Sequence, residues 1–392
     1  MATRILLFTG KGGVGKTTCA AATAVEASRR GLRTLIMSSD PAHSLADALD
    51  QKLGPEPVAV MPNLWGQEVD LYFSMKKYWG NMRDLMLSVF KWQGVDRVAA
   101  EEMAALPGMG EASALLWLDL FYRSGDYDLI VLDSAPTGET LTLLTLPQVA
   151  QWWVSKAFPF QKTAVKTVGF AVRKTTGVPL DRGYAELDKL FATLSEIQTV
   201  LQDPDISSTR LVMNPERMVI AEARRAYTYL QLYGYGVDCV VVNRIIPEDD
   251  AGGVMARYVE AQKGYLEEIE NSFTPLPILH VPHIGEEVFG LPLLQRLGEE
   301  LYAGLDPAGV FHREQAYRLD AEGDAYILSL HLPFLGDEEA HAEQFSDSLV
   351  VSVGNQRRNY SLPNFMAYYR LAEAAHAEDW LRVRFVPTDA TR

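Results

Sequence analysis

The fold of this chain is decided near its start by the stretch Gly10-Lys11-Gly12-Gly13-Val14-Gly15-Lys16-Thr17. The stretch satisfies the pattern G-x-x-x-x-G-K-[ST] of a phosphate-binding loop. An apolar run from Ile5 to Thr9 precedes it and predicts a buried strand, and the alanine-rich segment from Ala20 to Arg30 predicts a helix after it. A strand before and a helix after are the context that separates a phosphate site from a tight glycine turn.

Phosphate chemistry explains the residue types in this loop. Its glycines let backbone N–H groups point into one concavity at a helix N-terminus, where a polyphosphate is attracted. We expect Lys16 to reach the β and γ phosphates and the Thr17 hydroxyl to bind Mg²⁺. The nucleotide-binding residues predicted here are Gly10, Lys11, Gly12, Gly13, Val14, Gly15, Lys16, Thr17 and Thr18.

A second metal-binding residue is expected at Asp133, directly after the apolar run from Leu129 to Leu132. An aspartate at a strand end commonly holds the Mg²⁺ of a bound nucleotide through water. An aspartate in this place is also typical of a helix N-cap. The phosphate-binding loop favours the metal-binding interpretation.

Further apolar runs alternate with helical sequence over the first three-quarters of the chain. This alternation predicts parallel βαβ units, and therefore an α/β domain with a parallel doubly wound sheet. Two long insertions, at about 72–122 and 147–200, are expected to be helical. The further strands are predicted at Leu35–Ser38, Leu129–Leu132, Leu211–Asn214 and Cys239–Asn243.

The first insertion carries an apolar stripe with helical spacing, formed by Met75, Trp79, Met82, Met86 and Val89. Two interpretations stay open for this amphipathic helix. Such a stripe commonly packs on the core of its own domain. Methionine is also flexible and polarizable, so the stripe is equally suited to a groove that receives varied apolar helices.

The texture of the sequence changes after about Leu305. Residues alternate with a period of two in Tyr326–Pro333, Leu349–Val353 and Leu381–Phe385, with Gly, Asp and Asn between these runs. This pattern predicts a C-terminal antiparallel β-sandwich. We place the domain boundary so that residues 1–311 form the nucleotide-binding domain and residues 312–392 the β domain.

Composition excludes several classes of protein. The chain of 392 residues has 36 basic and 51 acidic side chains, a formal charge of −15, which disfavours a grip on nucleic-acid phosphates or an anionic membrane. Its two cysteines, Cys19 and Cys239, cannot form a disulfide framework and suit a reducing compartment. No apolar stretch approaches the length of a transmembrane helix. We therefore expect a cytoplasmic protein without a signal peptide.

Lys11 adds a second lysine to the loop, and in this the chain resembles the deviant Walker-A class of dimeric ATPases. More narrowly it resembles the family of arsenical-pump ATPases and of the targeting ATPases for tail-anchored proteins in the GET pathway. The β domain is similar to the α-crystallin domain of small heat-shock proteins. The motifs that carry the ATPase resemblance, in order, are Ser38–Leu45, Pro107–Glu111, Asp133–Thr140, Asn214–Met218 and Val241–Arg244. Ser38–Leu45 resembles the family's first switch, and Asp133–Thr140 resembles its second.

The resemblance implies a Mg-dependent ATPase that closes as a homodimer around two ATP molecules. It implies that Lys11 crosses to the partner's phosphates and that Asp40 positions the attacking water. Lys11, Lys16 and Asp40 would be the catalytic residues. The remaining implied residues are Glu216 and Asn243 near the ribose and base, Pro282 against adenine, and Pro136 and Gly138 in the second switch.

The family places its client-binding helical subdomain in the insertions, with Met75, Trp79, Met82 and Met86 as client-binding residues. The resemblance thus implies a chaperone or targeting factor that binds and releases hydrophobic helices. Two alternatives stay open: an ATPase that energises an arsenite or ion pump with an unidentified membrane partner, and a holdase regulated by nucleotide. Three family features are missing, because the chain has no Cys-x-x-Cys zinc clasp, no metalloid-binding cysteines, and Glu139 where a histidine is usual.

Overall fold

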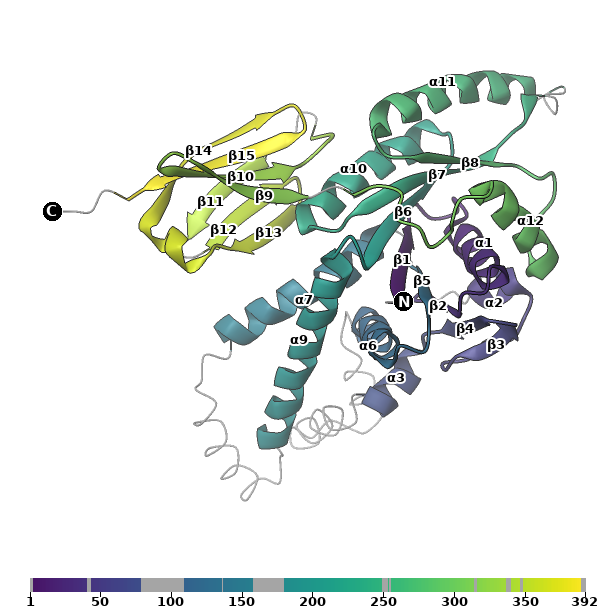
Figure 1. Cartoon of the computed structure of the whole chain (residues 1–392), viewed down its shortest axis with the longest axis horizontal. Helices are drawn as coiled ribbons and strands as arrows, with labels where there is room; N and C mark the ends of the chain where they lie inside the picture. The colour runs from purple at the N-terminus through teal and green to yellow at the C-terminus, as the bar shows by residue number, and fades with distance from the viewer. Residues whose placement is uncertain are drawn as a thin grey trace, which may run out of the picture. The chain divides into compact units, whose positions relative to one another are not determined.

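The computed structural model describes residues 3–40, 44–78, 109–135, 137–157, 180–248, 253, 255–313, 316–335, 340–345 and 348–388. Contacts divide the chain into two compact units (Figure 1). Unit 1 comprises Met1–Phe8, Lys16–Leu201 and Glu287–Ala308. Unit 2 comprises Thr9–Gly15, Gln202–Glu286 and Gly309–Arg392.

The main sheet has eight strands in the order β3-β4-β2-β5-β1-β6-β7-β8. The predicted parallel α/β sheet is confirmed, and the pairings β1–β5, β2–β4, β2–β5, β6–β7 and β7–β8 are all parallel. Only β3 runs antiparallel, because it forms a hairpin with β4 around Asn63, whose φ is 64°. The strands are β1 Arg4–Thr9, β2 Thr34–Ser38, β3 Val58–Met61, β4 Leu64–Glu68, β5 Leu129–Asp133, β6 Ser207–Met213, β7 Val237–Ile245 and β8 Ile278–Pro282.

In unit 1, the close packing of two helices explains the alanine-rich sequence after the loop. Helix α1 (Lys16–Arg29) is buried along most of its length and packs against α12 (Gly290–Tyr302). Small residues let the helices approach closely, because a Cβ at Gly298 would lie only 2.7 Å from the Ala22 carbonyl oxygen. The Thr23 and Tyr302 hydroxyls are joined by a hydrogen bond of 2.6 Å. Helix α2 (Ser44–Leu49) packs beside them.

The described parts of the two insertions are helical, as predicted. They form α3 (Leu71–Tyr78), α6 (Met109–Ser124), α7 (Thr137–Ala157) and α9 (Leu180–Gln202). All four helices contribute to one apolar cluster, which joins the buried Met109 and Ala112 to Leu71, Leu116, Leu146 and Leu190. Met75 lies in α3, whereas Trp79, Met82 and Met86 lie outside the described residues.

In unit 2, strand β6 begins at Ser207, earlier than the predicted run Leu211–Asn214. Its polar residues are buried because they pair with a neighbouring strand: Ser208 donates to Asp238 Oδ2 over 2.8 Å, and Arg210 forms a fully buried ion pair with Asp238. Arg210 also donates to the Gly309 carbonyl. The helices here are α10 (Arg217–Tyr233) and α11 (Met255–Phe273).

The C-terminal β domain, also in unit 2, contains two antiparallel sheets, ordered β14-β15-β10-β9 and β11-β12-β13. The predicted period-two runs supply its core, since Leu328, Leu330, Leu349, Val351 and Val383 are all buried. Four strands escaped prediction because polar, mostly exposed residues dominate them. The strands are β9 Tyr317–Glu322, β10 Ala325–His331, β11 Ala340–Phe345, β12 Ser348–Val353, β13 Gln356–Ser361, β14 Tyr369–Ala377 and β15 Trp380–Pro387.

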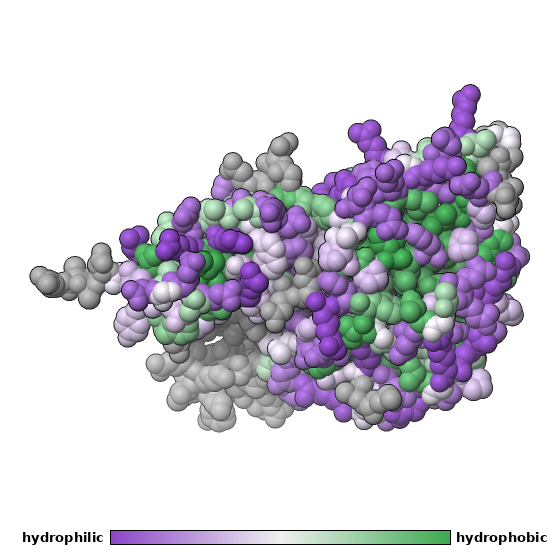
Figure 2. All heavy atoms as spheres, turned by 45° about the horizontal axis from the view of Figure 1, so that its top comes forward, coloured by the Kyte–Doolittle hydropathy of each residue, from purple (hydrophilic) through white to green (hydrophobic). Residues whose placement is uncertain are grey.

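Hydrophilic residues cover most of the face drawn in Figure 2, and hydrophobic residues gather in patches between them. Within the part of the chain that the structure describes, no helix combines the length and apolar composition needed to cross a bilayer.

Two glycines in helices, one packed against a neighbouring helix and one exposed, should respond in opposite ways to replacement by alanine. Gly298→Ala places a methyl group against the backbone of α1, so we expect it to lower the free energy of unfolding by about 1–3 kcal/mol. Gly264→Ala, on the exposed side of α11 where nothing lies within 4 Å, is the control. It should raise that free energy by about 0.5–1 kcal/mol. Urea unfolding measures both, and equal stabilities would contradict the packing described.

Candidate functional site

The phosphate-binding loop has a backbone that side chains would disrupt. Gly10, Gly13 and Gly15 have φ angles of 153°, 83° and 93°, a region that favours glycine. A Cβ at Gly10 would lie 2.1 Å from the Val212 carbonyl oxygen of β6, and one at Gly15 would lie 2.2 Å from Asn243 Nδ2. The glycines are thus required by φ and by close contacts with β6 and β7.

Asn243, near the carboxyl end of β7, supports the loop through its side chain. Its Nδ2 donates to the Val14 carbonyl oxygen over 2.8 Å, and its Oδ1 accepts from the backbone N–H of Arg244 over 2.9 Å. Arg244 has a φ of 59°, which turns the chain immediately after the asparagine. The family resemblance implies a place near the base, and this supporting contact with the loop is an addition that sequence spacing did not reveal.

The predicted metal-binding residues meet within unit 1. The Thr17 hydroxyl, in the first turn of α1, donates to Asp133 Oδ2 over 2.9 Å. Ser38, at the end of β2, donates to the same oxygen over 3.3 Å. Ser44 Oγ lies 3.2 Å from Thr17 Oγ1. The end of β2 and the first turn of α1 therefore bring two hydroxyl groups to one carboxylate oxygen at the end of β5, which the N-cap interpretation of Asp133 did not require.

The second oxygen of Asp133 fits a metal site. Asp133 is fully buried, and its Oδ1 has no hydrogen-bond partner among the described residues. Burial raises the pKa of Asp133 to about 7, while the Thr17 hydrogen bond and the charge of the nearby Lys16 oppose that rise. A buried acceptor beside a hydroxyl suits Mg²⁺, which is bound through one or two protein oxygens plus waters and phosphates. Thr17 and Asp133 are the residues that would hold it.

Asp40 lies close to this carboxylate, after the end of β2. Its backbone N–H donates to Ser38 Oγ over 3.2 Å, and its charge contributes to raising the pKa of Asp133. The next residues, 41–43, lie outside the described part of the chain. The first predicted switch thus begins beside Lys16, Thr17 and Asp133.

The second predicted switch follows β5. Ser134 Oγ donates to the Phe8 carbonyl oxygen over 2.6 Å, and Thr140 Oγ1 donates to the Ala135 carbonyl oxygen over 2.8 Å. Gly138 is exposed in the first turn of α7, and Pro136 lies outside the described residues. These hydrogen bonds fasten the segment to β1 and to its own helix.

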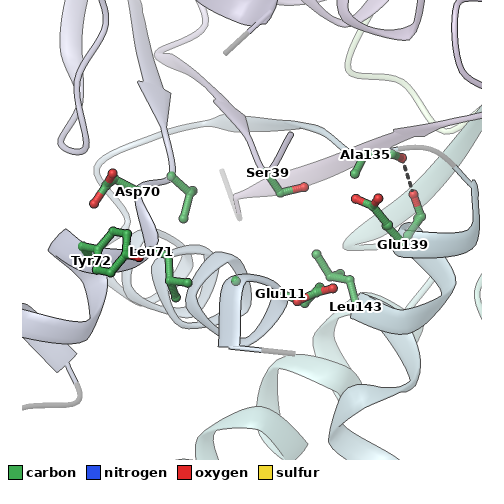
Figure 3. A pocket seen from close by; sticks show the side chains of 11 residues that line it. Ser39, Asp70, Leu71, Tyr72, Glu111, Ala135, Glu139 and Leu143 are labelled. Carbon is green, nitrogen blue, oxygen red and sulfur yellow. Dashed lines mark hydrogen bonds between the residues drawn. The ribbon is translucent and has the colours of Figure 1, made fainter. Parts of the chain in front are cut away.

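Residues of both predicted switch segments and of the helical insertion line one cavity of about 290 Å³. Figure 3 shows Ala135 and Glu139 on one side, Asp70, Leu71 and Tyr72 on the other, and Ser39, Glu111 and Leu143 between them. The wall therefore joins both switches to α3, α6 and α7.

The other predicted nucleotide residues lie in unit 2. Lys11 Nζ lies 4.0 Å from Glu222 Oε2 of α10. Glu216, the exposed N-cap of α10, accepts from the Tyr258 hydroxyl over 3.3 Å. Pro282 ends β8, where it is opposite Ile245 of β7. Glu222 is a residue that sequence reasoning missed, because nothing in its helical context marks it as a partner of the loop.

Comparison with known families identifies both parts of the chain. Residues 3–303 match the family described as anion-transporting ATPase. Residues 323–385 match the HSP20-like domain found in ArsA. The resemblances predicted for both parts of the chain are confirmed.

Curated relatives cover nearly the whole chain. A protein of Chlorobaculum tepidum is 38% identical over 387 residues, which is 97% of this chain and 96% of that protein. One of Aquifex aeolicus is 36% identical over 372 residues, 92% of this chain and 94% of its own length. A second A. aeolicus protein is 30% identical over 310 residues, 77% of this chain and 100% of its own length. All three are named provisionally as arsenical pump-driving ATPases.

The orphaned oxygen of Asp133 predicts a metal-dependent loss of activity. Asp133→Asn should reduce Mg²⁺-dependent ATP hydrolysis by about 100-fold, because removing one preorganised charge-stabilising group commonly costs that much. ATP binding measured in EDTA should change little. Asp128→Asn is the matched control, since Asp128 precedes the same strand at its opposite end and pairs with Arg33. A variant pair with equal Mg²⁺-dependent hydrolysis would contradict the metal site.

Proposed function

The chain belongs to the anion-transporting ATPase family. On that premise we propose that the protein forms a homodimer, which opens and closes as it hydrolyses ATP with Mg²⁺. In this proposal the homodimer binds and releases hydrophobic segments of client proteins. It acts in the cytoplasm, a reducing compartment that suits a chain with only two cysteines. The observation that carries the ATPase part is the buried, unpartnered Oδ1 of Asp133 beside Thr17 and Lys16.

Each residue of the site has a task in phosphoryl transfer, which needs positioning and charge neutralisation. The loop backbone receives the phosphates, and Lys16 neutralises their charge. Thr17 and Asp133 hold Mg²⁺, which supplies charge neutralisation when bound. Asp40 orients the attacking water. Asn243 keeps the loop in its binding conformation through Val14.

The homodimer is supported by exposed side chains in unit 2. Met218, Met255 and Tyr258 expose 73%, 40% and 39% of their surface, although all three have large apolar side chains. Tyr258 contacts Glu216, so at least this part of the apolar surface adjoins a predicted nucleotide residue. A second copy that covers such residues would be placed to receive Lys11 at its phosphates.

Client binding is supported by the helical insertion. The helices α3, α6, α7 and α9 share one apolar cluster, and the cavity beside both switches reaches three of them. A change of nucleotide state at the switches would therefore act on α3, the helix that carries Met75. Hydrophobic helices are the clients that such a stripe suits.

The names of the relatives favour a second candidate function, that of an arsenical pump-driving ATPase. Metalloid binding by thiolates requires accessible cysteines. The chain has two cysteines, and Cys19 and Cys239 are both fully buried. Any role in pumping would therefore depend on a partner for metalloid recognition. The HSP20-like match also favours a holdase as a further alternative.

Replacing the loop lysine tests the ATPase assignment. Lys16→Ala should lower ATP hydrolysis by about 100-fold or more, since it removes the charge that stabilises the transferred phosphoryl group. Lys52→Ala, which removes an exposed lysine of the same unit, is the control and should hydrolyse ATP normally. Steady-state phosphate release measures both. Normal turnover by Lys16→Ala would refute the proposal.

Trapping the ATP state tests client binding. Asp40→Asn should bind ATP without hydrolysing it, because the attacking water loses its orienting carboxylate. A fluorescent peptide with a hydrophobic helix of about 20 residues should bind this variant in only one of the two states, with or without ATP. A peptide in which Ser replaces alternate Leu residues is the control. Equal binding in both states would support a holdase, and hydrolysis stimulated by arsenite in the wild-type protein would support the pump-driving function.

A further inference from the structure

The C-terminal end of α10 is built into the core of the β domain. Leu232 of α10 is fully buried and belongs to the same apolar cluster as Leu330, Val351 and Phe385 of the β strands. Both parts lie in unit 2. Helix α10, which follows β6 of the main sheet, therefore ends in the core of the C-terminal β domain.

Two side chains of β13 complete the hydrogen bonding of this helix end. The Tyr360 hydroxyl and one terminal nitrogen of Arg358 both donate to the Leu232 carbonyl oxygen, each over 2.6 Å. The last carbonyls of a helix lack partners within the helix and carry partial negative charge. A buried guanidinium and a buried hydroxyl satisfy both needs.

The fit at this end leaves little room for change. Gly234 ends the helix with a φ of 81°, and a Cβ there would lie 2.9 Å from Arg358. The Arg358 guanidinium also lies 4.2 Å from the centre of the Tyr360 ring. Burial raises the pKa of Tyr360 to about 12, so its hydroxyl remains a donor.

Two neighbouring contacts strengthen the attachment. The Tyr233 hydroxyl donates to Gln356 Oε1 over 2.7 Å, and the Thr228 hydroxyl donates to the Pro333 carbonyl oxygen. The β domain thus contacts the last two turns of α10 from β13 and from the segment after β10. The contact is a specific attachment rather than a flexible tether.

The opposite half of α10 reaches the phosphate-binding loop. Glu222 in its second turn lies 4.0 Å from Lys11, and both side chains are about one-third exposed. The helix has 17 residues, so an α-helix of this length spans about 25 Å. The Glu222 carboxylate therefore competes with a phosphate for the charge of the Lys11 ammonium group.

We infer that Arg358 and Tyr360 are positioning residues of the ATPase, which act through α10 and Glu222 on Lys11. By holding the end of α10, the β domain keeps Glu222 in place, and Glu222 restrains Lys11. This inference rests on the proposed nucleotide function. It assigns the C-terminal domain a part in setting nucleotide affinity.

The test compares the affinity of the full chain for a fluorescent, non-hydrolysable ATP analogue among variants at the two ends of α10. Glu222→Gln should tighten binding by about twofold to fivefold, the range expected for a part-exposed ion pair. Arg358→Ala should shift affinity in the same direction. Arg357→Ala, which removes the neighbouring exposed arginine of β13, should not change affinity.

The double variant decides whether the ends communicate. Glu222 and Leu232, whose carbonyl Arg358 contacts, lie about 15 Å apart along the helix, a separation at which independent effects usually add. If the β domain acts through Glu222, Arg358→Ala will have no further effect in the Glu222→Gln background. Additive effects would overturn the inference, as would a lower melting temperature of Arg358→Ala with unchanged affinity.

Tyr360→Phe covers the case in which Arg358→Ala fails to fold. It keeps the ring in the core and removes only one donor to Leu232, so it should produce a smaller shift of affinity in the same direction. If Arg358→Ala does not fold and Tyr360→Phe binds the analogue as tightly as the wild type does, the inference is also overturned. These binding measurements do not test the ATPase proposal itself, which is tested separately by ATP hydrolysis in Lys16→Ala.

Discussion

The contact between Gly15 and the Asn243 amide constrains the rest of the nucleotide site. No side chain fits at Gly15, because a Cβ there would lie 2.2 Å from Asn243 Nδ2, and the same nitrogen binds the Val14 carbonyl oxygen. The loop is therefore held against the end of β7 by a residue more than 200 positions later in the chain. Lys16 and Thr17 follow this loop directly, so their direction depends on that support.

Buried charged groups are the second organising feature, as Arg210 and Asp133 show. Arg210 and Asp238 satisfy one another between β6 and β7, so their burial stabilises the start of the sheet only while both are present. Asp133 differs, because Thr17 and Ser38 occupy one of its oxygens and nothing described occupies the other. An acceptor left unsatisfied in a core is costly. A metal-binding role accounts for that cost.

Helix α10 relates two parts of the chain that the sequence presents as separate domains. Its end is capped by Arg358 and Tyr360, and its second turn meets Lys11. The second Aquifex aeolicus relative has no counterpart for about a quarter of this chain, so the family tolerates a shorter architecture. Where the β domain is present, it supplies donors that the helix end would otherwise find in water.

The sequence by itself determined the phosphate-binding loop, the parallel sheet and the period-two core of the β domain, because each follows from local spacing of residue types. Its motifs, in order, also carried the resemblance to the family. It could not reveal the polar start of β6, the support of the loop by Asn243, or the partners Glu222 and Arg358. Those depend on contacts between residues distant along the chain, and hydrogen bonds between buried polar groups leave no periodic signal. Only the tertiary structure decided which oxygen of Asp133 has no hydrogen-bond partner among the described residues and where α10 ends, since both are set by what packs around them.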